Sequence, residues 1–170
     1  MHRLTSETLR TPLLRIAGPC DRAHGKGERS HTVRSVIRQV VNLDAPAEAL
    51  FEAYLDPARH AAITGSPVVI SKKAGSRFRA FDGALNGTML AVVEPTLIVQ
   101  SWRSSAFKKR DADSTLILIF MQQGRRGRIH LTHLDVPDHD HKGVAEGWKT
   151  YYWVPWRRCL SRELQSLRTA

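Results

Sequence analysis

A histidine inside a strand-like run, His133, is the residue whose type and position best suit chemistry near neutral pH. In the alternating run from 127 to 134 it falls on the side predicted to face the protein interior. An inward imidazole can hold the polar head of a ligand or act as an acid or base, because its pKa lies near neutrality. A histidine satisfied by partners within the core is the more common case, so both interpretations stand.

Two further histidines and two aspartates cluster in the sequence DHDHK, at residues 138–142. The loop offers metal-ligating atoms, but the rest of the chain supplies no convincing third and fourth ligand. His130 lies three residues before His133 and faces the opposite side of the strand, so these two imidazoles cannot share a metal. The sequence therefore predicts no metal site and no cofactor, and Asp138 or Asp140 is better explained as the start of a helix.

Nucleophilic catalysis finds no support in the sequence. There is no G-x-S-x-G motif, and no glycine-rich loop matches a phosphate-binding or dinucleotide-binding fingerprint. Cys159 falls on the apolar side of a predicted helix, where a thiol is inert packing rather than a nucleophile. We therefore expect a protein without catalytic residues, and keep an enzyme as an alternative.

The aromatic residues are concentrated in the segment GWKTYYWVPW, residues 147–156, which holds three of the four tryptophans. From about residue 142 the chain has helical periodicity, and Pro155 should bend this helix because it removes a backbone donor. The rings either wall a cavity beneath the helix or fill a solid core, and both interpretations remain open. The apolar side of the helix consists of Trp148, Tyr152, Trp153, Trp156, Cys159, Leu160, Leu164 and Leu167.

The elements that must position these residues follow a simple order from residue 33 onward. A β-branched run at 33–43 predicts a first strand, and the segment 44–56 predicts a helix with Pro46 at its first position. Asp56-Pro57 should end that helix, and a second short helix is expected through 61–62. Short turn-rich connectors then separate strands, so neighbours should pair antiparallel. These strands are expected at 67–71, 76–81, 85–95, 97–103, 114–123 and 127–134.

This order predicts an α+β domain in which a curved antiparallel sheet of about seven strands grips a long C-terminal helix. Six segments, in sequence, resemble the family related to the C-terminal domain of the activator of heat-shock protein 90 ATPase, within the START-like or SRPBCC helix-grip superfamily. The resemblance implies a helix-grip domain, which we place at residues 33–170. Residues 1–32 mix Arg, Ser, Thr, Gly and Pro with one short apolar patch, and are expected to form a flexible N-terminal extension. The segments are APAEALFEAYLDPARHAAITG, GSRFRAFDGALNGTML, EPTLIVQSWRS, STLILIF, IHLTHLDVPD and GWKTYYWVPW.

The resemblance also implies a hydrophobic cavity between the sheet and the C-terminal helix. We expect a non-catalytic module that holds a hydrophobic or amphipathic small molecule there. The alternatives are a protein-interaction module that regulates a heat-shock protein 90-type chaperone, and a cyclase- or hydrolase-like enzyme with His133 as acid or base. The residues expected to line the cavity are Phe78, Gln100, Trp102, Leu118, Phe120, Leu131, His133, Trp148 and Tyr152.

The outer face of one predicted strand departs from the family pattern. In STLILIF the outward positions usually filled by threonine are Ile117 and Ile119, and Met121 follows them. A strand with one wet face should alternate apolar and polar residues, and this strand does not. We therefore expect something to cover this face, either a second copy of the chain in a homodimer or the extension 1–32.

The composition narrows the partners. The formal net charge is +10, but its densest clusters, 108–110 and 125–128, fall in expected hairpin loops, where solvated turns explain them better than a nucleic-acid site. The chain has no apolar run near the roughly 20 residues that span a bilayer, so no membrane insertion is expected. Two cysteines without a CxxC pair fit a reducing compartment, and predict a cytoplasmic protein.

Overall fold

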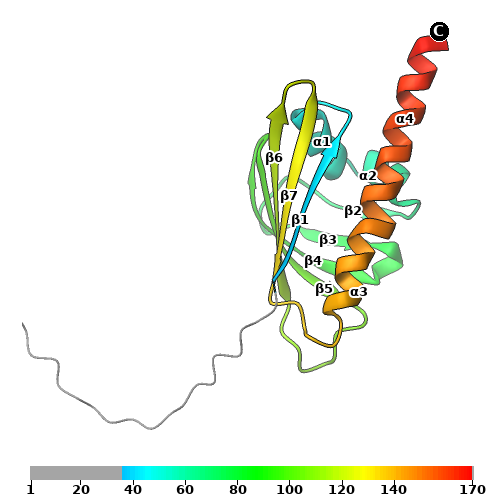
Figure 1. The fold of residues 1–170 in the computed structure, drawn as a ribbon. Coiled ribbons are helices and arrows are strands. Elements are labelled where there is room, and N and C mark those ends of the chain that lie inside the picture. The colour runs from blue at the N-terminus through cyan, green and yellow to red at the C-terminus, as the bar shows by residue number, and fades with distance from the viewer. Residues whose placement is uncertain (1–35, 170) are drawn as a thin grey trace, which may run out of the picture. The chain divides into compact units, whose positions relative to one another are not determined.

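The computed structural model describes residues 36–169, so the predicted extension 1–32 lies outside the described residues. Two short helices follow the first strand, and a helical stretch ends the chain (Figure 1). The elements are β1 (Ile37–Leu43), α1 (Ala47–Leu55), α2 (Pro57–Thr64), β2 (Val68–Val69), β3 (Arg77–Ala80), the 3-10 turn η1 (Phe81–Gly83), β4 (Leu85–Val93), β5 (Leu97–Ser104), β6 (Ser114–Gln123), β7 (Arg126–Leu134), α3 (His141–Gly147), the π-helical segment η2 (Trp148–Trp153) and α4 (Val154–Thr169).

The seven strands form one antiparallel sheet in the order β1-β7-β6-β5-β4-β3-β2. Consecutive strands from β2 to β7 are neighbours, and β1 closes the far edge by pairing with β7. Figure 1 shows α1, α2 and the α3–α4 stretch on one side of this sheet, with α4 running across it. The predicted α+β helix-grip fold is confirmed.

Local chemistry sets the boundary between the first two helices. The Asp56 side chain accepts a hydrogen bond from the Arg59 backbone N–H at 2.7 Å, which caps α2, and Pro57 occupies its first turn. Gly65 ends α2 with a φ of 71°, a left-handed conformation that glycine adopts without steric cost. The break at Asp56-Pro57 is as predicted, whereas Pro46 precedes α1 in an extended conformation instead of occupying its first position.

The inward face of the central strands is the predicted one. Alternate residues of β5, β6 and β7 are buried beneath the helices, with exposed fractions of 4% or less. This confirms the alternation at Ile98, Gln100, Trp102, Leu116, Leu118, Phe120, Ile129, Leu131 and His133.

The aromatic segment does not form an ordinary α-helix. The backbone N–H of Val154 donates to the carbonyl of Lys149, five residues earlier, as in a π-helix. Pro155 follows directly and has no N–H to give to the Tyr151 carbonyl, so α-helical bonding cannot run through this turn. The wider turn brings Trp148 and Trp153 into a stack with ring centroids 5.6 Å apart.

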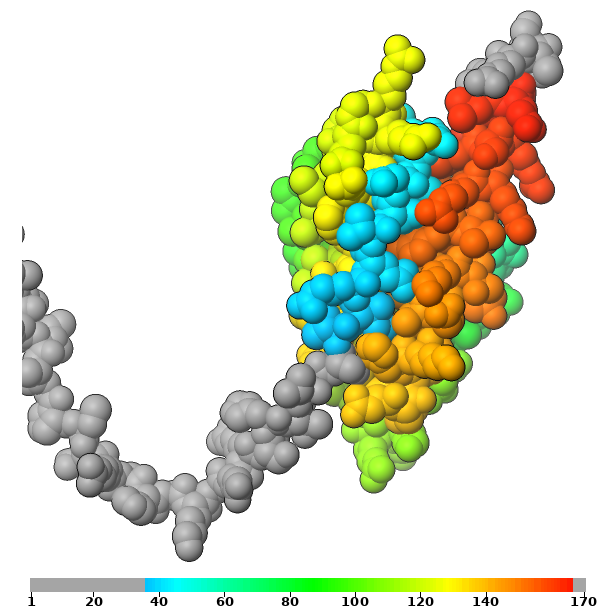
Figure 2. Space-filling view, viewed as in Figure 1, coloured from blue at the N-terminus to red at the C-terminus, as the bar shows by residue number. Residues whose placement is uncertain are grey.

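The far end of α4 is less buried than its periodicity predicts. Trp156 and Leu160 are buried, Cys159 is half-buried, and Leu164 is 42% exposed, so the prediction was wrong for Leu164. Figure 2 shows the described end of α4, in red, at the edge of the molecule and away from the strands. The side chain of Leu167 lies outside the described part of the chain.

Candidate functional site

A partly open pocket of about 450 Å³ lies at the α3 end of the domain, between the helical stretch and the sheet. Its walls come from η1 and the start of β4, from the end of β5, and from α3 and η2, which Figure 1 shows at this end. Aromatic rings dominate the surface. The lining residues are Phe81, Ala84, Leu85, Trp102, Ser104, Asp140, Gly143, Val144, Gly147, Trp148, Tyr151 and Tyr152.

Three of the nine residues predicted to line a cavity, Trp102, Trp148 and Tyr152, lie on the wall of this pocket. The other six are buried in the core and are not part of its lining: Phe78, Gln100, Leu118, Phe120, Leu131 and His133. Side chains from α1 and α2 fill the space in front of them. The Phe51 ring meets the Phe120 ring edge to face at 5.5 Å, and the Tyr54 hydroxyl donates to Gln100 Oε1 at 2.8 Å.

His133 is held on both ring nitrogens by protein groups. The indole Nε1–H of Trp148 donates to His133 Nδ1 at 3.2 Å, and because an indole can only donate, Nδ1 must be the unprotonated nitrogen. His133 Nε2 therefore carries the proton and donates to Ser114 Oγ at 2.8 Å. Burial, with a smaller effect of His141, lowers the pKa of His133 to about 3. The imidazole is neutral near pH 7 and links the helix to the sheet.

The serine continues this chain of hydrogen bonds to the pocket wall. Ser114 Oγ donates to the backbone carbonyl of Trp102 at 2.8 Å. The Trp102 ring also meets the His133 ring edge to face, with centroids 4.7 Å apart. The two tryptophans of the pocket are thus fixed to each other through His133 and Ser114.

A second buried histidine, His60, was not identified as a candidate from the sequence. His60 Nδ1 donates to the Tyr54 carbonyl at 2.7 Å, which leaves Nε2 as an acceptor without a partner. Burial lowers the pKa of His60 to about 4, so the ring is neutral. Its ring packs against those of Tyr54 and Tyr152, with centroids at 4.6 and 5.6 Å. The hydroxyl pKa values of both tyrosines are raised, first of all by burial.

Two side chains of the pocket wall carry buried polar atoms that have no hydrogen-bond partner. They are the Trp102 indole N–H and the Tyr152 hydroxyl, on residues that are 4% and 3% exposed. Leaving a buried donor unpaired costs about 1–3 kcal/mol, so such atoms need an explanation. Both atoms are closed off from the pocket space, so a bound molecule would reach them only if the wall shifted.

The turn η1 forms the opposite lip of the pocket in a strained conformation. Phe81 and Asp82 have φ values of 52° and 53°, in the left-handed region that costs a non-glycine residue about 1–3 kcal/mol. The Phe81 ring meets Tyr151 at 5.8 Å and Tyr152 at 6.0 Å. Tyr151 is 57% exposed, which places this ring pair at the edge of the pocket. Strained residues of this kind cluster at binding sites.

Of the loop DHDHK, Asp140 reaches the pocket lining. His139 pairs instead with Asp111 at 2.8 Å, and this hydrogen bond lowers the Asp111 pKa. Within residues 36–169 no three histidine, cysteine, aspartate or glutamate side chains gather as metal ligands would. Arg77 and Arg79 stay outside the lining, and Arg79 donates instead to the Asp82 carbonyl at 3.2 Å. No helix in the described part of the chain is long and apolar enough to cross a membrane.

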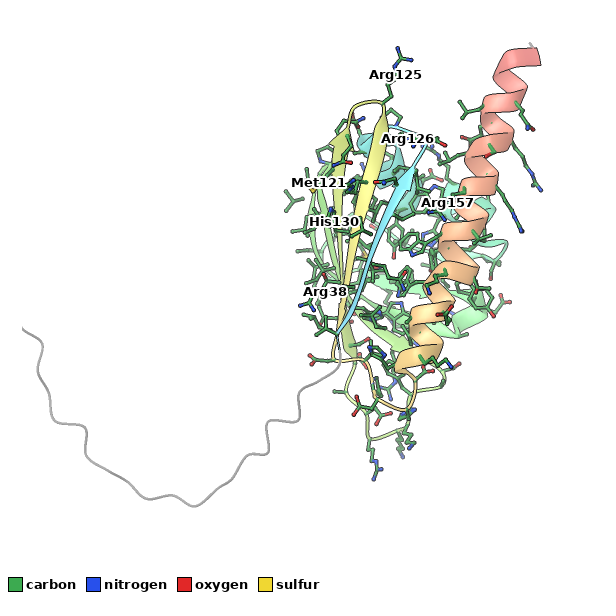
Figure 3. All side chains as sticks on the ribbon, viewed as in Figure 1. Arg38, Met121, Arg125, Arg126, His130 and Arg157 are labelled. Atoms are coloured by element: carbon green, nitrogen blue, oxygen red, sulfur yellow. The ribbon has the colours of Figure 1, made fainter. Side chains whose placement is uncertain are left out.

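The outer face of the sheet carries an apolar row that crosses five strands. Ile119 at its centre is 41% exposed, Val40 at its β1 end is 58% exposed, and Met121 beside the row is 48% exposed. Figure 3 shows Met121 and His130 on the side of the sheet away from α4. We call these cross-strand neighbours the outer row: Val40, His130, Ile119, Leu97 and Val93.

Comparisons with known proteins agree with this architecture. An HSP90 activator from Plasmodium falciparum superposes with a TM-score of 0.67 at 21% identity, covering 74% of this chain and 96% of that one. The Aha1 dimer from Colwellia psychrerythraea gives a TM-score of 0.63 at 9% identity, with 74% and 96% covered. These likenesses show the fold.

The sequence comparisons identify the family. An uncharacterised protein of Schizosaccharomyces pombe is 33% identical over 90 residues, which are 50% of this chain and only 27% of that relative's length. The family model described as Activator of Hsp90 ATPase homolog 1-like protein matches residues 44–153. Because that match spans more than half of the sequence, the chain belongs to the Activator of Hsp90 ATPase homolog 1-like family.

Proposed function

We propose that this protein is a non-catalytic binding module that holds an apolar or amphipathic small molecule in the pocket between η1, β5, α3 and η2. The observation that carries the proposal is the pocket itself, because about 450 Å³ of aromatic-lined space falls within the usual 300–1,000 Å³ of ligand sites. The low cysteine content supports a cytoplasmic location for the module.

The chemistry of the lining favours binding over catalysis. The lining contains no histidine, cysteine or lysine, the side chains that most often act as base or nucleophile. His133, the residue considered for acid–base work, has both nitrogens engaged within the protein and stays neutral near pH 7. The pocket therefore offers shape and apolar contact.

A substitution that fills the pocket tests this function. Ala84→Trp adds a large ring to the lining, so we expect at least an approximately tenfold loss of affinity for the neutral apolar dye Nile red, measured by fluorescence titration. Native mass spectrometry with a lipid and metabolite library then searches for the natural ligand.

The matched control is Ala112→Trp, which adds the same ring to an exposed position outside the lining. It should bind Nile red as the unmodified protein does. If Ala84→Trp leaves dye binding unchanged, or if the protein takes up neither the dye nor any library compound, ligand binding in this pocket is refuted.

The family supports a second candidate function, regulation of an Hsp90-type chaperone ATPase. The matching family is described by that activity, and an HSP90 activator has the same fold. An unchanged Hsp90 ATPase rate in the presence of the protein would remove this candidate. If the protein accelerates the Hsp90 ATPase while its pocket binds no compound, chaperone regulation becomes the leading candidate function.

We further propose that the outer row forms a homodimer interface. Val40, Ile119 and Val93 are exposed in the single chain, and contact with a second copy would remove them from water. Ile119→Lys places a charge in the middle of the row, so we expect the dimer to dissociate in sedimentation-velocity experiments.

Thr115→Lys provides the control, because it adds the same charge on β6 at a position outside the row. This variant should sediment as the unmodified protein does. A monomer for the unmodified protein at high micromolar concentration would refute the dimer.

A further inference from the structure

The pocket has an unusual charge for this protein. The chain carries a formal charge of +10, yet the lining contains neither lysine nor arginine. Its one charged side chain is Asp140. A ligand anion in the pocket would therefore lose water without gaining a counter-cation, which is costly in an apolar site.

Asp140 also occupies the position where an anion would meet the helix. It precedes α3, and its Oδ1 lies over the first turn so closely that a Cβ on Gly143 would approach it to 2.8 Å. Asp140 makes no capping hydrogen bond to the helix, but its negative charge lies beside the first turn. A carboxylate or phosphate on a ligand would meet repulsion at this end of the pocket.

The lining offers aromatic surface instead of charge, because its two unpaired polar atoms, the Trp102 indole N–H and the Tyr152 hydroxyl oxygen, are closed off from the pocket space. Five aromatic rings in the lining favour a flat aromatic body: Phe81, Trp102, Trp148, Tyr151 and Tyr152.

We infer that the pocket selects uncharged aromatic compounds and excludes carboxylates and phosphates of the same size. The inference rests on the proposed function, because it names the class of ligand for the same pocket. A fatty-acid site differs from this pocket, because it needs a cation or several hydrogen-bond donors for the ligand's carboxylate.

Two probes with the same ring body test the inference by isothermal titration calorimetry at pH 7. The alcohol 2-(2-naphthyl)ethanol should bind at least about tenfold more tightly than 2-naphthylacetate. Asp140→Asn removes the repulsion and should narrow this ratio by raising the affinity for the acetate.

Glu146→Gln is the matched control, because it removes a charge from the same helix at a position outside the lining. It should leave the ratio of the two affinities unchanged. Equal or tighter binding of the acetate overturns the selectivity and leaves the pocket as a ligand site. Binding of neither probe, together with an empty protein in the library screen, overturns both the selectivity and the proposed function.

Discussion

Acidification from pH 6.5 to pH 4.5 is expected to lower the free energy of unfolding by about 5 kcal/mol, through His60 and His133. Burial lowers their folded-state pKa values to about 4 and about 3, whereas both return to about 6.5 in the unfolded chain. Below pH 6.5, each of these rings therefore binds a proton in the unfolded chain but stays largely unprotonated in the folded protein. Stability is retained above pH 6.5 and lost as the pH falls toward the folded values. Urea denaturation followed by tryptophan fluorescence measures the decrease.

Variants assign this pH dependence to the two rings. His60→Phe removes one titrating ring and should reduce the decrease by about half. The control is Ala112→Trp, which adds a ring at an exposed position without changing a titrating group and should keep the full decrease. An unaltered pH profile in His60→Phe would show that this ring is not a source of the acid sensitivity.

A methyl group at Gly87 is expected to destabilise the protein by more than about 3 kcal/mol. Gly87 lies in β4 between Phe78 of β3 and Trp102 of β5, next to the inner wall of the pocket. A Cβ at this position would approach the Ser101 backbone carbonyl oxygen to 1.9 Å. Because that oxygen belongs to the neighbouring strand, relief requires separation of β4 from β5. Thermal and urea denaturation of Gly87→Ala measure the loss.

Gly147→Ala makes the same chemical change where space is available. The nearest atom to its added Cβ is Cδ2 of Tyr151 at 3.7 Å, an ordinary contact, and the backbone is helical. Alanine in a helix is favoured over glycine by about 0.5–1 kcal/mol, so this variant should be as stable as the unmodified protein or more so. Equal stability of the Gly87 and Gly147 variants would contradict the close approach at β4.

The sequence predicts most of the fold because the relevant signals are local. Asp56-Pro57 and Gly65 mark the helix boundaries through their own backbone preferences. Alternation along β5–β7 depends only on the two-residue period of a strand, so the inward residues are recognised without tertiary information. The family resemblance adds the way in which the sheet and the last helix are arranged.

The site is predicted less well because it depends on contacts between distant elements. Gln100 and Phe120 are inward as expected, but Tyr54 and Phe51 of α1 occupy the space in front of them. No local pattern shows how far those rings reach across the sheet. The contribution of Phe81 was missed because an aromatic residue with a positive φ runs against the usual turn preferences. The adjacent Asp82-Gly83 was the available signal for a tight turn.

The π-helical turn changes how the C-terminal sequence should be read. A hydrogen bond that spans five residues inserts one extra position per turn, so the angular phase of side chains after Val154 is offset from that of α3. A single helical wheel drawn through both parts therefore misassigns faces, and each part needs a wheel of its own. Loss of one residue between Lys149 and Val154 would turn this five-residue bond into an ordinary four-residue one and keep Trp156 and Leu160 on the buried side, whereas loss of one residue between Trp156 and Leu160 would rotate the rest of α4 by about 100°.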